Sequence, residues 1–136
     1  MRRKSVCWTR AKINATDRLH SLVVRERDDH QCQWPGCGRS KAGGWQLHAA
    51  HIFSRRYKQT RHLTINALTL CATHHQWATD HDTEWQAFAR QRIGEEAYTR
   101  LLILAKGPAM RAPDEFAARR GLHEELARLT REQVTG

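Results

Sequence analysis

Residues 47–77 read LHAAHIFSRRYKQTRHLTINALTLCATHHQW, and we take this stretch as the centre of the fold. It contains five of the nine histidines in the chain, which are His48, His51, His62, His74 and His75. It also contains Cys71, one of four cysteines. Cysteine thiolates and histidine rings are the usual ligands of zinc, and a neutral histidine can also accept a proton during catalysis. The stretch therefore raises two separate questions, one about a structural metal site and one about a catalytic site.

Two close pairs of soft ligands predict a structural zinc site. Cys32 and Cys37 are separated by four residues, and Cys71 and His74 by two. Structural zinc is held by four tetrahedral nitrogen or sulfur ligands, which are usually delivered as two such pairs. The Pro and Gly residues between Cys32 and Cys37 favour the tight turn of a zinc knuckle. The alternative is a set of reduced cysteines that serve only as small core residues. Cys7 stands alone and is interpreted as a bystander.

Hydrophobic spacing predicts an α+β fold of several helices around a short strand region. A helix is expected over residues 16–27, followed by short strands at 30–34 and 45–53 and a polar basic loop at 54–64. Residues 67–70 form a short apolar step before a helix that runs from just after Cys71 to Ala78. Further helices are expected at 83–93, 95–106 and 113–131. The expected organisation is a basic N-terminal arm at 1–15, a main domain at 16–106 and a C-terminal helical appendage at 107–136.

The excess of positive charge is confined to the first half of the chain. Residues 1–62 contain 14 Lys and Arg against 4 Asp and Glu, whereas residues 63–136 contain 9 against 10. A localised basic surface indicates a polyanionic partner, although a basic surface can also serve only solubility. The mean hydropathy is −0.75, no apolar run reaches the length of a membrane span, and no signal peptide is recognised. We therefore expect a cytoplasmic protein that does not bind membranes.

Three segments together resemble an HNH endonuclease of the ββα-metal (His-Me finger) type. The matching segments are RDDHQCQWPGC at 27–37, LHAAHIFSRR at 47–56 and NALTLCATHHQW at 66–77. They are most similar to the phage-type group linked to recombination, known as NinG and Rap. The resemblance covers roughly residues 25–105. It implies a ββα-metal core on a zinc knuckle with flanking helices, in a bacterial or phage-infected host cell.

The resemblance also implies a role for each matching residue. His51 matches the general base that takes a proton from the attacking water, and Asn66 matches the residue that orients the ring by a side-chain hydrogen bond. His75 matches the helix-borne ligand of a catalytic divalent cation such as Mg²⁺ or Mn²⁺. Cys71 and His74 match the second pair of zinc ligands.

The chain departs from the family at Ala50, where many members have a second metal ligand directly before the base. His48 lies two residues earlier on the expected strand and would point to the same side as residue 50. His81 and Asp82, which follow the helix, are the other candidates. Ala50 leaves the second protein ligand of the catalytic metal undecided.

The expected partner is DNA, and the basic loop supplies candidate phosphate contacts. These are Arg55, Arg56, Lys58 and Arg61, and arginine suits the role because it can bind a phosphate with two hydrogen bonds. The alternative for each is an ordinary solvated surface charge. Tryptophans of the chain can either stack on bases or pack the small sheet against the helices.

The sequence thus predicts a metal-dependent DNA endonuclease acting in recombination or DNA processing. It leaves the oligomeric state open, with a dimer through the last helix as one option. A zinc-stabilised DNA-binding module without cleavage activity is the main alternative. A zinc-built protein-interaction domain is a third, but it leaves the basic first half unexplained.

Overall fold

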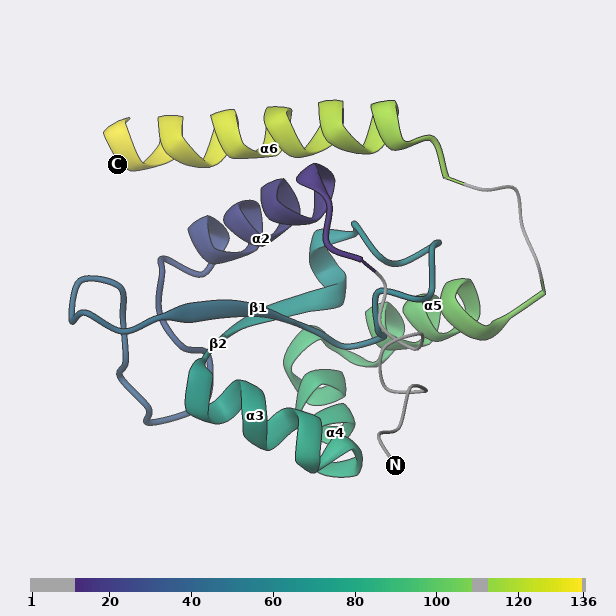
Figure 1. Ribbon diagram of the computed structural model, residues 1–136, viewed down its shortest axis with the longest axis horizontal. Helices are drawn as coiled ribbons and strands as arrows, with labels where there is room; N and C mark the ends of the chain where they lie inside the picture. Colours follow the sequence, from purple (N-terminus) through teal and green to yellow (C-terminus); the bar gives the residue numbers. More distant parts are fainter. Residues whose placement is uncertain (1–11, 109–112, 136) are drawn as a thin grey trace, which may run out of the picture.

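The computed structural model describes residues 12–108 and 113–135, with side chains described up to residue 132. A two-stranded sheet lies in the middle of the molecule (Figure 1). Helix α2 covers one side of it and α3 and α4 lie on the other, while α6 runs along the outside of α2. The elements follow in the order α2 (Ala15–Arg27), β1 (Leu47–His51), η1 (Thr64–Asn66), β2 (Ala67–Cys71), α3 (Ala72–Asp80), α4 (Asp82–Ile93), α5 (Glu95–Lys106) and α6 (Glu115–Thr135).

Helix α2 begins at a capping box. The side chain of Asn14 accepts a hydrogen bond from the backbone of Asp17, and the Asp17 carboxylate accepts one from the backbone of Asn14. Such reciprocal bonds satisfy N–H groups that the first turn of a helix leaves without partners. The inward face of the helix carries His20, Val23 and Val24, which are completely buried. The cap therefore fixes one end of α2, and the buried face holds the helix against the sheet.

The two strands are antiparallel, and their register decides which side chains share a face. Ala50 lies opposite Leu68, and His51 lies opposite Ala67. Because successive side chains point to opposite faces, His48 and Ala50 share one face while His51 lies on the other. Thr69 donates a hydrogen bond to the carbonyl of Val24, which places the face of His51 against α2. The face of His48 looks toward α3, where the ring of His48 lies 5.0 Å from the ring of His75.

The main hydrophobic core lies between the sheet and helices α3, α4 and α5. Leu70, Trp85, Ala89 and Leu101 are each at most 3% exposed, and they belong to one cluster of buried residues. Trp34 packs into the edge of this cluster, with its ring 4.6 Å from that of Trp77 and 4.8 Å from that of Phe88. Packing is thus the role that the structure gives most of the described tryptophans. Trp45 differs, since it is 48% exposed.

The mixed α and β composition expected from the sequence is confirmed, and most helices agree with their expected bounds. The strand expected at residues 30–34 is wrong, because only a single bridge joins Gln31 to Ser40 there. The apolar step at 67–70 is the strand β2. The C-terminal helix packs along α2, where it buries Leu122. The expected basic arm lies mostly outside the described residues. None of the helices within the described ranges is long and apolar enough to cross a membrane.

Candidate metal centre and histidine cavity

Cys32 and Cys37 are brought together by a turn at the residues between them. The backbone N–H of Cys37 donates to the carbonyl of Trp34, and the N–H of Cys32 donates to the carbonyl of Arg39. Gly36 has a φ of 78°, in the left-handed region where a side chain is unfavourable. The turn therefore depends on a glycine inside the Cys32–Cys37 spacing, and it aims both sulfur atoms at the same point.

Cys71 and His74 reach that point from the junction of β2 and α3. Cys71 is the last residue of β2 and the N-cap of α3, and His74 lies in the first turn of that helix. The ligand atoms of Cys32, Cys37, Cys71 and His74 all lie within 4.8 Å of one another. The Sγ atoms of Cys37 and Cys71 are 3.9 Å apart, and Nδ1 of His74 is 3.3 Å from Sγ of Cys71. These four residues could hold a metal ion.

The surroundings of the four ligands favour at least one thiolate. Burial would raise the pKa of the Cys71 thiol, but hydrogen bonds from His74 and from the guanidinium of Arg39 outweigh burial and lower that pKa to about 6. Burial raises the pKa of Cys32 to about 11. A metal that binds here must therefore displace a proton from Cys32, and Arg39 supplies a positive charge beside the resulting thiolates.

His51 occupies the end of β1 on the side of α2. Its ring atom Nε2 lies 3.0 Å from the carbonyl oxygen of Arg61, so Nε2 carries the proton and donates it to that oxygen. A neutral ring that donates from Nε2 keeps its lone pair on Nδ1, where it can accept a proton. Burial, then the neighbouring His20 ring and the guanidinium of Arg55, lower the pKa of His51 to about 3. The ring is therefore neutral at physiological pH.

The sequence predicted a hydrogen bond from the Asn66 side chain to the ring of His51, and that prediction is wrong. The Asn66 amide is completely buried and bonds only to backbone groups. It accepts from the N–H of Phe53 and donates to the carbonyls of Phe53 and Thr60. Both of these residues belong to the loop between the strands, and this loop contains the carbonyl that accepts from His51. Asn66 therefore acts on the loop and only indirectly on the ring.

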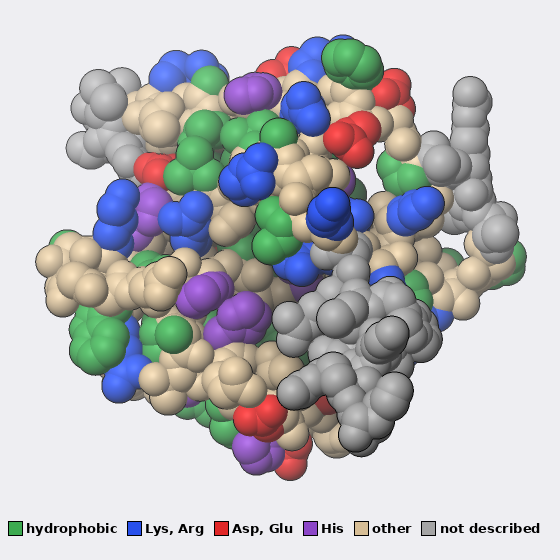
Figure 2. All heavy atoms as spheres, in the orientation of Figure 1, with side chains coloured by type: hydrophobic (Ala, Val, Ile, Leu, Met, Phe, Trp, Pro, Cys, Tyr) green, Lys and Arg blue, Asp and Glu red, His purple; other side chains and the backbone are tan. Residues whose placement is uncertain are grey.

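His75 lies on α3 and faces β1 from the other side of the sheet. Burial, followed by the nearby His48 and Arg55, lowers the pKa of the His75 ring. The Nε2 atom of His48 is buried without a hydrogen-bond partner. Of the candidates for a second ligand, His48 is the one whose ring lies beside that of His75. Figure 2 shows histidine side chains close together near the centre of that view, below a band of Lys and Arg side chains.

His51 and His75 line the same cavity, although they sit on opposite faces of the sheet. The cavity lies where β1 ends and has a volume of about 790 Å³. Arg55 and Arg56 form part of its wall, and Lys106 of α5 contributes a further positive charge. The ammonium of Lys106 lies 5.9 Å from the ring centre of Tyr57, another lining residue. One space therefore brings together two neutral histidines and three cationic side chains.

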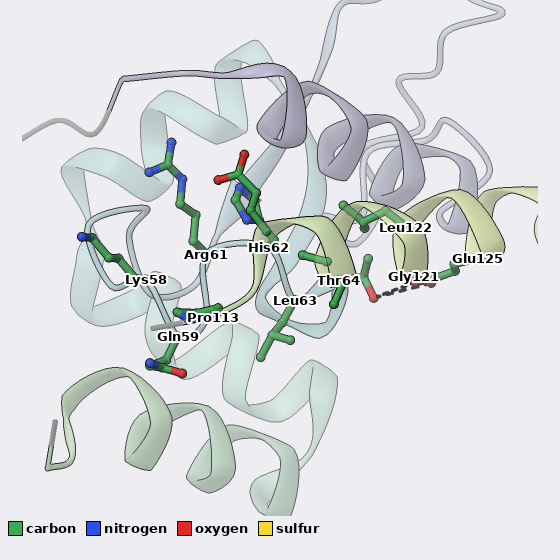
Figure 3. Close-up of a pocket in the computed structure, with 13 residues that line it drawn as sticks. Lys58, Gln59, Arg61, His62, Leu63, Thr64, Pro113, Gly121, Leu122 and Glu125 are labelled. Atoms are coloured by element: carbon green, nitrogen blue, oxygen red, sulfur yellow. Dashed lines mark hydrogen bonds between the residues drawn. The ribbon is translucent and has the colours of Figure 1, made fainter. Parts of the chain in front are cut away.

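The basic loop does not act as one surface. Arg56 is exposed and donates a hydrogen bond to the hydroxyl of Tyr57. Lys58 is exposed too, but it lines a separate cavity between the loop and α6 (Figure 3). Arg61 was predicted to contact phosphate, and the structure gives it another partner. Its guanidinium is paired with both carboxylate oxygens of Asp17, at 2.8 and 2.5 Å, and its side chain is only 14% exposed. Arg61 is therefore a structural residue in this conformation.

Three contributors to the site were missed in the sequence. His20 is completely buried, with its ring 5.0 Å from that of His51. Its position one turn before Val23 and Val24 on the inward face of α2 was the available signal. Asp17 was placed only at the start of the expected helix over residues 16–27, and its partner Arg61 lies 44 residues away. Lys106 was read only as the end of a helix.

No family model, curated protein or solved structure matches this chain.

Proposed function

We propose that this chain is a metal-dependent DNA endonuclease in which His51 is the general base. The observation that carries the proposal is the cavity shared by His51, His75 and Arg55. A nuclease must combine a proton acceptor, a place for a cation and positive charge for the phosphate in one space. The strands β1 and β2 followed directly by α3 are also the order of elements that a ββα-metal core would have.

The four-residue metal site is proposed to hold structural Zn²⁺. Zinc–sulfur bonds of about 2.3 Å give a sulfur–sulfur separation of about 3.8 Å in a regular tetrahedron. The 3.9 Å between the sulfur atoms of Cys37 and Cys71 fits this geometry. The ion would join the knuckle to the junction of β2 and α3, and so fix the start of the helix that carries His75.

In the proposed reaction, Nδ1 of His51 accepts a proton from a water molecule. The water oxygen attacks phosphorus, a new phosphorus–oxygen bond forms, and the bond to the leaving sugar oxygen breaks. That oxygen takes a proton from a solvent water molecule, and His51 releases its proton to solvent. The carbonyl of Arg61 holds Nε2–H and thereby fixes the tautomer that leaves Nδ1 as the acceptor. The negative charge of the bound phosphate raises the pKa of the ring, which makes a buried histidine a stronger base in the complex. Arg55 and Arg56 supply positive charge to the phosphate.

His75 and His48 are the residues that would hold the catalytic divalent cation. The buried and unpartnered Nε2 of His48, together with a ring separation of 5.0 Å, fits two nitrogen ligands on one ion. Such an ion, when bound to the phosphate, neutralises the charge that develops during the attack. His48 would then replace the ligand that the chain lacks at Ala50.

Cleavage of plasmid DNA with Mg²⁺, Mn²⁺ or Ni²⁺ tests the function. His51→Ala should reduce the cleavage rate by about 10² to 10⁴-fold, because general-base assistance has this size. DNA affinity and metal content should change little, since the ring acts on water and adds little to ground-state binding. His75→Ala should also lose activity, and high Mn²⁺ should restore part of it. His123→Ala, at an exposed position on α6, is the matched control and should cleave normally.

A DNA-binding module without cleavage activity is the second candidate. Ala50 favours it, because this position lacks the second ligand of a catalytic metal. The positions of the other possible metal ligands favour it too. Within the described residues, only the cysteine-containing group places three or more ligand atoms close together. If the purified protein binds DNA and holds its structural metal but cuts nothing with any of the three cations, this second function is the better account.

A further inference from the structure

The segment 60–63 bears the carbonyl that holds the ring of His51, and helix α2 holds this segment in addition to the bond from Asn66 to Thr60. The Asp17 carboxylate binds the guanidinium of Arg61, and its Oδ1 also lies 2.9 Å from Nε2 of His62. One helical turn later, Nε2 of His20 donates to the carbonyl of Leu63 at 3.0 Å. Figure 3 shows Arg61, His62 and Leu63 following one another along this segment.

Asp17 holds the segment as a buried charge with two partners there, Arg61 and His62. Its side chain is 5% exposed, and those of Arg61 and His62 are each 14% exposed. A buried carboxylate needs such partners, since the charge is costly when it is left without them. The backbone N–H of Asn14 adds a further hydrogen bond at 2.8 Å. The cap of α2 and the 60–63 segment therefore form one connected unit.

This unit links Asp17, through Arg61, to the carbonyl that accepts from His51. The guanidinium of Arg61 extends to Asp17 and to the carbonyl of Lys12, while the carbonyl of the same residue accepts Nε2–H of His51. Arg61 is thus tied at its side chain to α2 and at its backbone to the histidine. If the side chain were released, the carbonyl would have fewer constraints on its position.

We propose that Asp17 is a positioning residue for His51, acting through Arg61 to keep the ring in the Nε2–H tautomer. The proposal deepens the nuclease function and rests on it for its catalytic consequence. The effect on the tautomer does not depend on that function. A displacement of about 1 Å in a catalytic group can reduce a rate about 100-fold. Asp17 acts on the base only through Arg61, so its loss should reduce the cleavage rate by less, about tenfold.

Asp17→Asn tests the proposal, because it removes the charge and preserves the size of the side chain. The matched control is Asp28→Asn. Asp28 is also an aspartate in a close pair with an arginine, Arg27, and its side chain is 7% exposed, but it has no bond to the 60–63 segment. Both variants should lose stability, so stability cannot distinguish a positioning role.

The distinguishing measurement is the tautomer of His51, observed by ¹⁵N NMR of the ring nitrogens in protein without DNA. The His51 signal is assigned from its loss in His51→Gln. Wild type and Asp28→Asn should show the Nε2–H tautomer, and Asp17→Asn should show a mixture. In the cleavage assay, Asp17→Asn should reduce kcat about tenfold and leave KM nearly unchanged. If Asp17→Asn does not fold, Arg61→Lys is measured instead, since it keeps the charge but loses the two-pronged contact.

The outcomes separate this proposal from the nuclease function. A changed tautomer in a protein that never cleaves DNA supports the positioning role and refutes the nuclease. If the variant retains the wild-type tautomer and the kcat of Asp28→Asn, Asp17 is only a structural residue and the proposal is wrong.

Discussion

His20 and His51 are two neutral imidazole rings held side by side inside the protein. Burial is the main reason that the pKa of His20 falls to about 4 and that of His51 to about 3. Both values lie below the value near 6.5 that applies to the unfolded chain. Between these limits the unfolded chain binds more protons than the folded one, and protonation therefore favours unfolding. The contribution of both rings to stability is complete above about pH 6.5 and is lost as the pH falls toward 4 and 3.

Replacing His20 with Gln should make stability less dependent on pH. A glutamine amide can still donate to the carbonyl of Leu63, but it does not titrate in this range. The free energy of unfolding, measured by urea denaturation between pH 4.5 and 6.5, should lose about 1.4 kcal/mol per pH unit of slope relative to wild type. Protonation of metal ligands affects both proteins equally and cancels in the comparison. His123→Gln should keep the wild-type slope. Equal slopes for His20→Gln and wild type would show that His20 titrates normally.

At the level of single residues, the sequence predicted which cysteines and histidine come together better than it predicted side-chain hydrogen bonds. The four residues that could hold a metal ion were identified from their spacing, because two short pairs at turns can converge in few ways. Asn66 was identified, but its hydrogen bonds were not, since they depend on how the loop between the strands folds back. Arg61 was misjudged for a similar reason. Its partner Asp17 is distant in sequence, and no local pattern distinguishes a paired arginine from a solvated one.

At the level of elements, the knuckle at residues 32–37 has little regular structure of its own. Its backbone bonds are turn contacts, and the nearby strand expected at 30–34 is reduced to one bridge. The apolar step at 67–70 was recognised but was not interpreted as a strand. The strand β2 has only five residues, Ala67–Cys71, and because all five are buried they show no alternation. The helices were predicted well, since caps, glycines and prolines mark their ends locally.

Cys32→Ser should release the metal and unfold the knuckle. Structural zinc contributes on the order of 10–16 kcal/mol in zinc-finger peptides, which is as large as the total stability of a small domain. Protein purified without added zinc should contain one zinc per chain by elemental analysis, and the variant should contain much less. Far-ultraviolet circular dichroism should show a loss of helix. Cys7→Ser, which changes a cysteine outside the predicted ligand set, should behave as wild type. An unchanged zinc content in Cys32→Ser would show that the proposed zinc site is wrong.

Leu122→Ala should destabilise the packing of α6 on α2. Leu122 is 4% exposed, and truncation of a buried leucine usually costs about 2–5 kcal/mol. We expect the lower end, about 2 kcal/mol, because a helix on the outside of the molecule can adjust to fill part of the space. Ile103→Ala, at a side chain that is 59% exposed, should cost less than about 1 kcal/mol. Urea unfolding measures both. Equal effects would mean that α6 adds no stability through this contact.

At the scale of the whole molecule, the fold changes how the positive charge should be interpreted. The sequence places the excess in residues 1–62, but several of those cations have internal partners. Arg27 pairs with Asp28 and donates to the carbonyls of Thr64 and Ala67, and Arg61 pairs with Asp17. The cavity meanwhile gains Lys106 from the second half of the chain. Charge counting predicted the sign of the surface, and only the folded structure shows which cations line the cavity.

The last prediction concerns binding of the whole protein to duplex DNA. Each phosphate contact adds about −0.9 to the slope of log affinity against log salt. Because Arg55 and Arg56 both line the histidine cavity, Arg55→Ala/Arg56→Ala should flatten that slope by about two units. Fluorescence anisotropy at several salt concentrations measures it. Arg120→Ala/Arg128→Ala removes the same charge from exposed positions on α6 and should leave the slope close to that of wild type. Equal flattening in both variants would mean that net charge, and not the cavity, binds DNA. No flattening in the first would show that the loop does not touch phosphate.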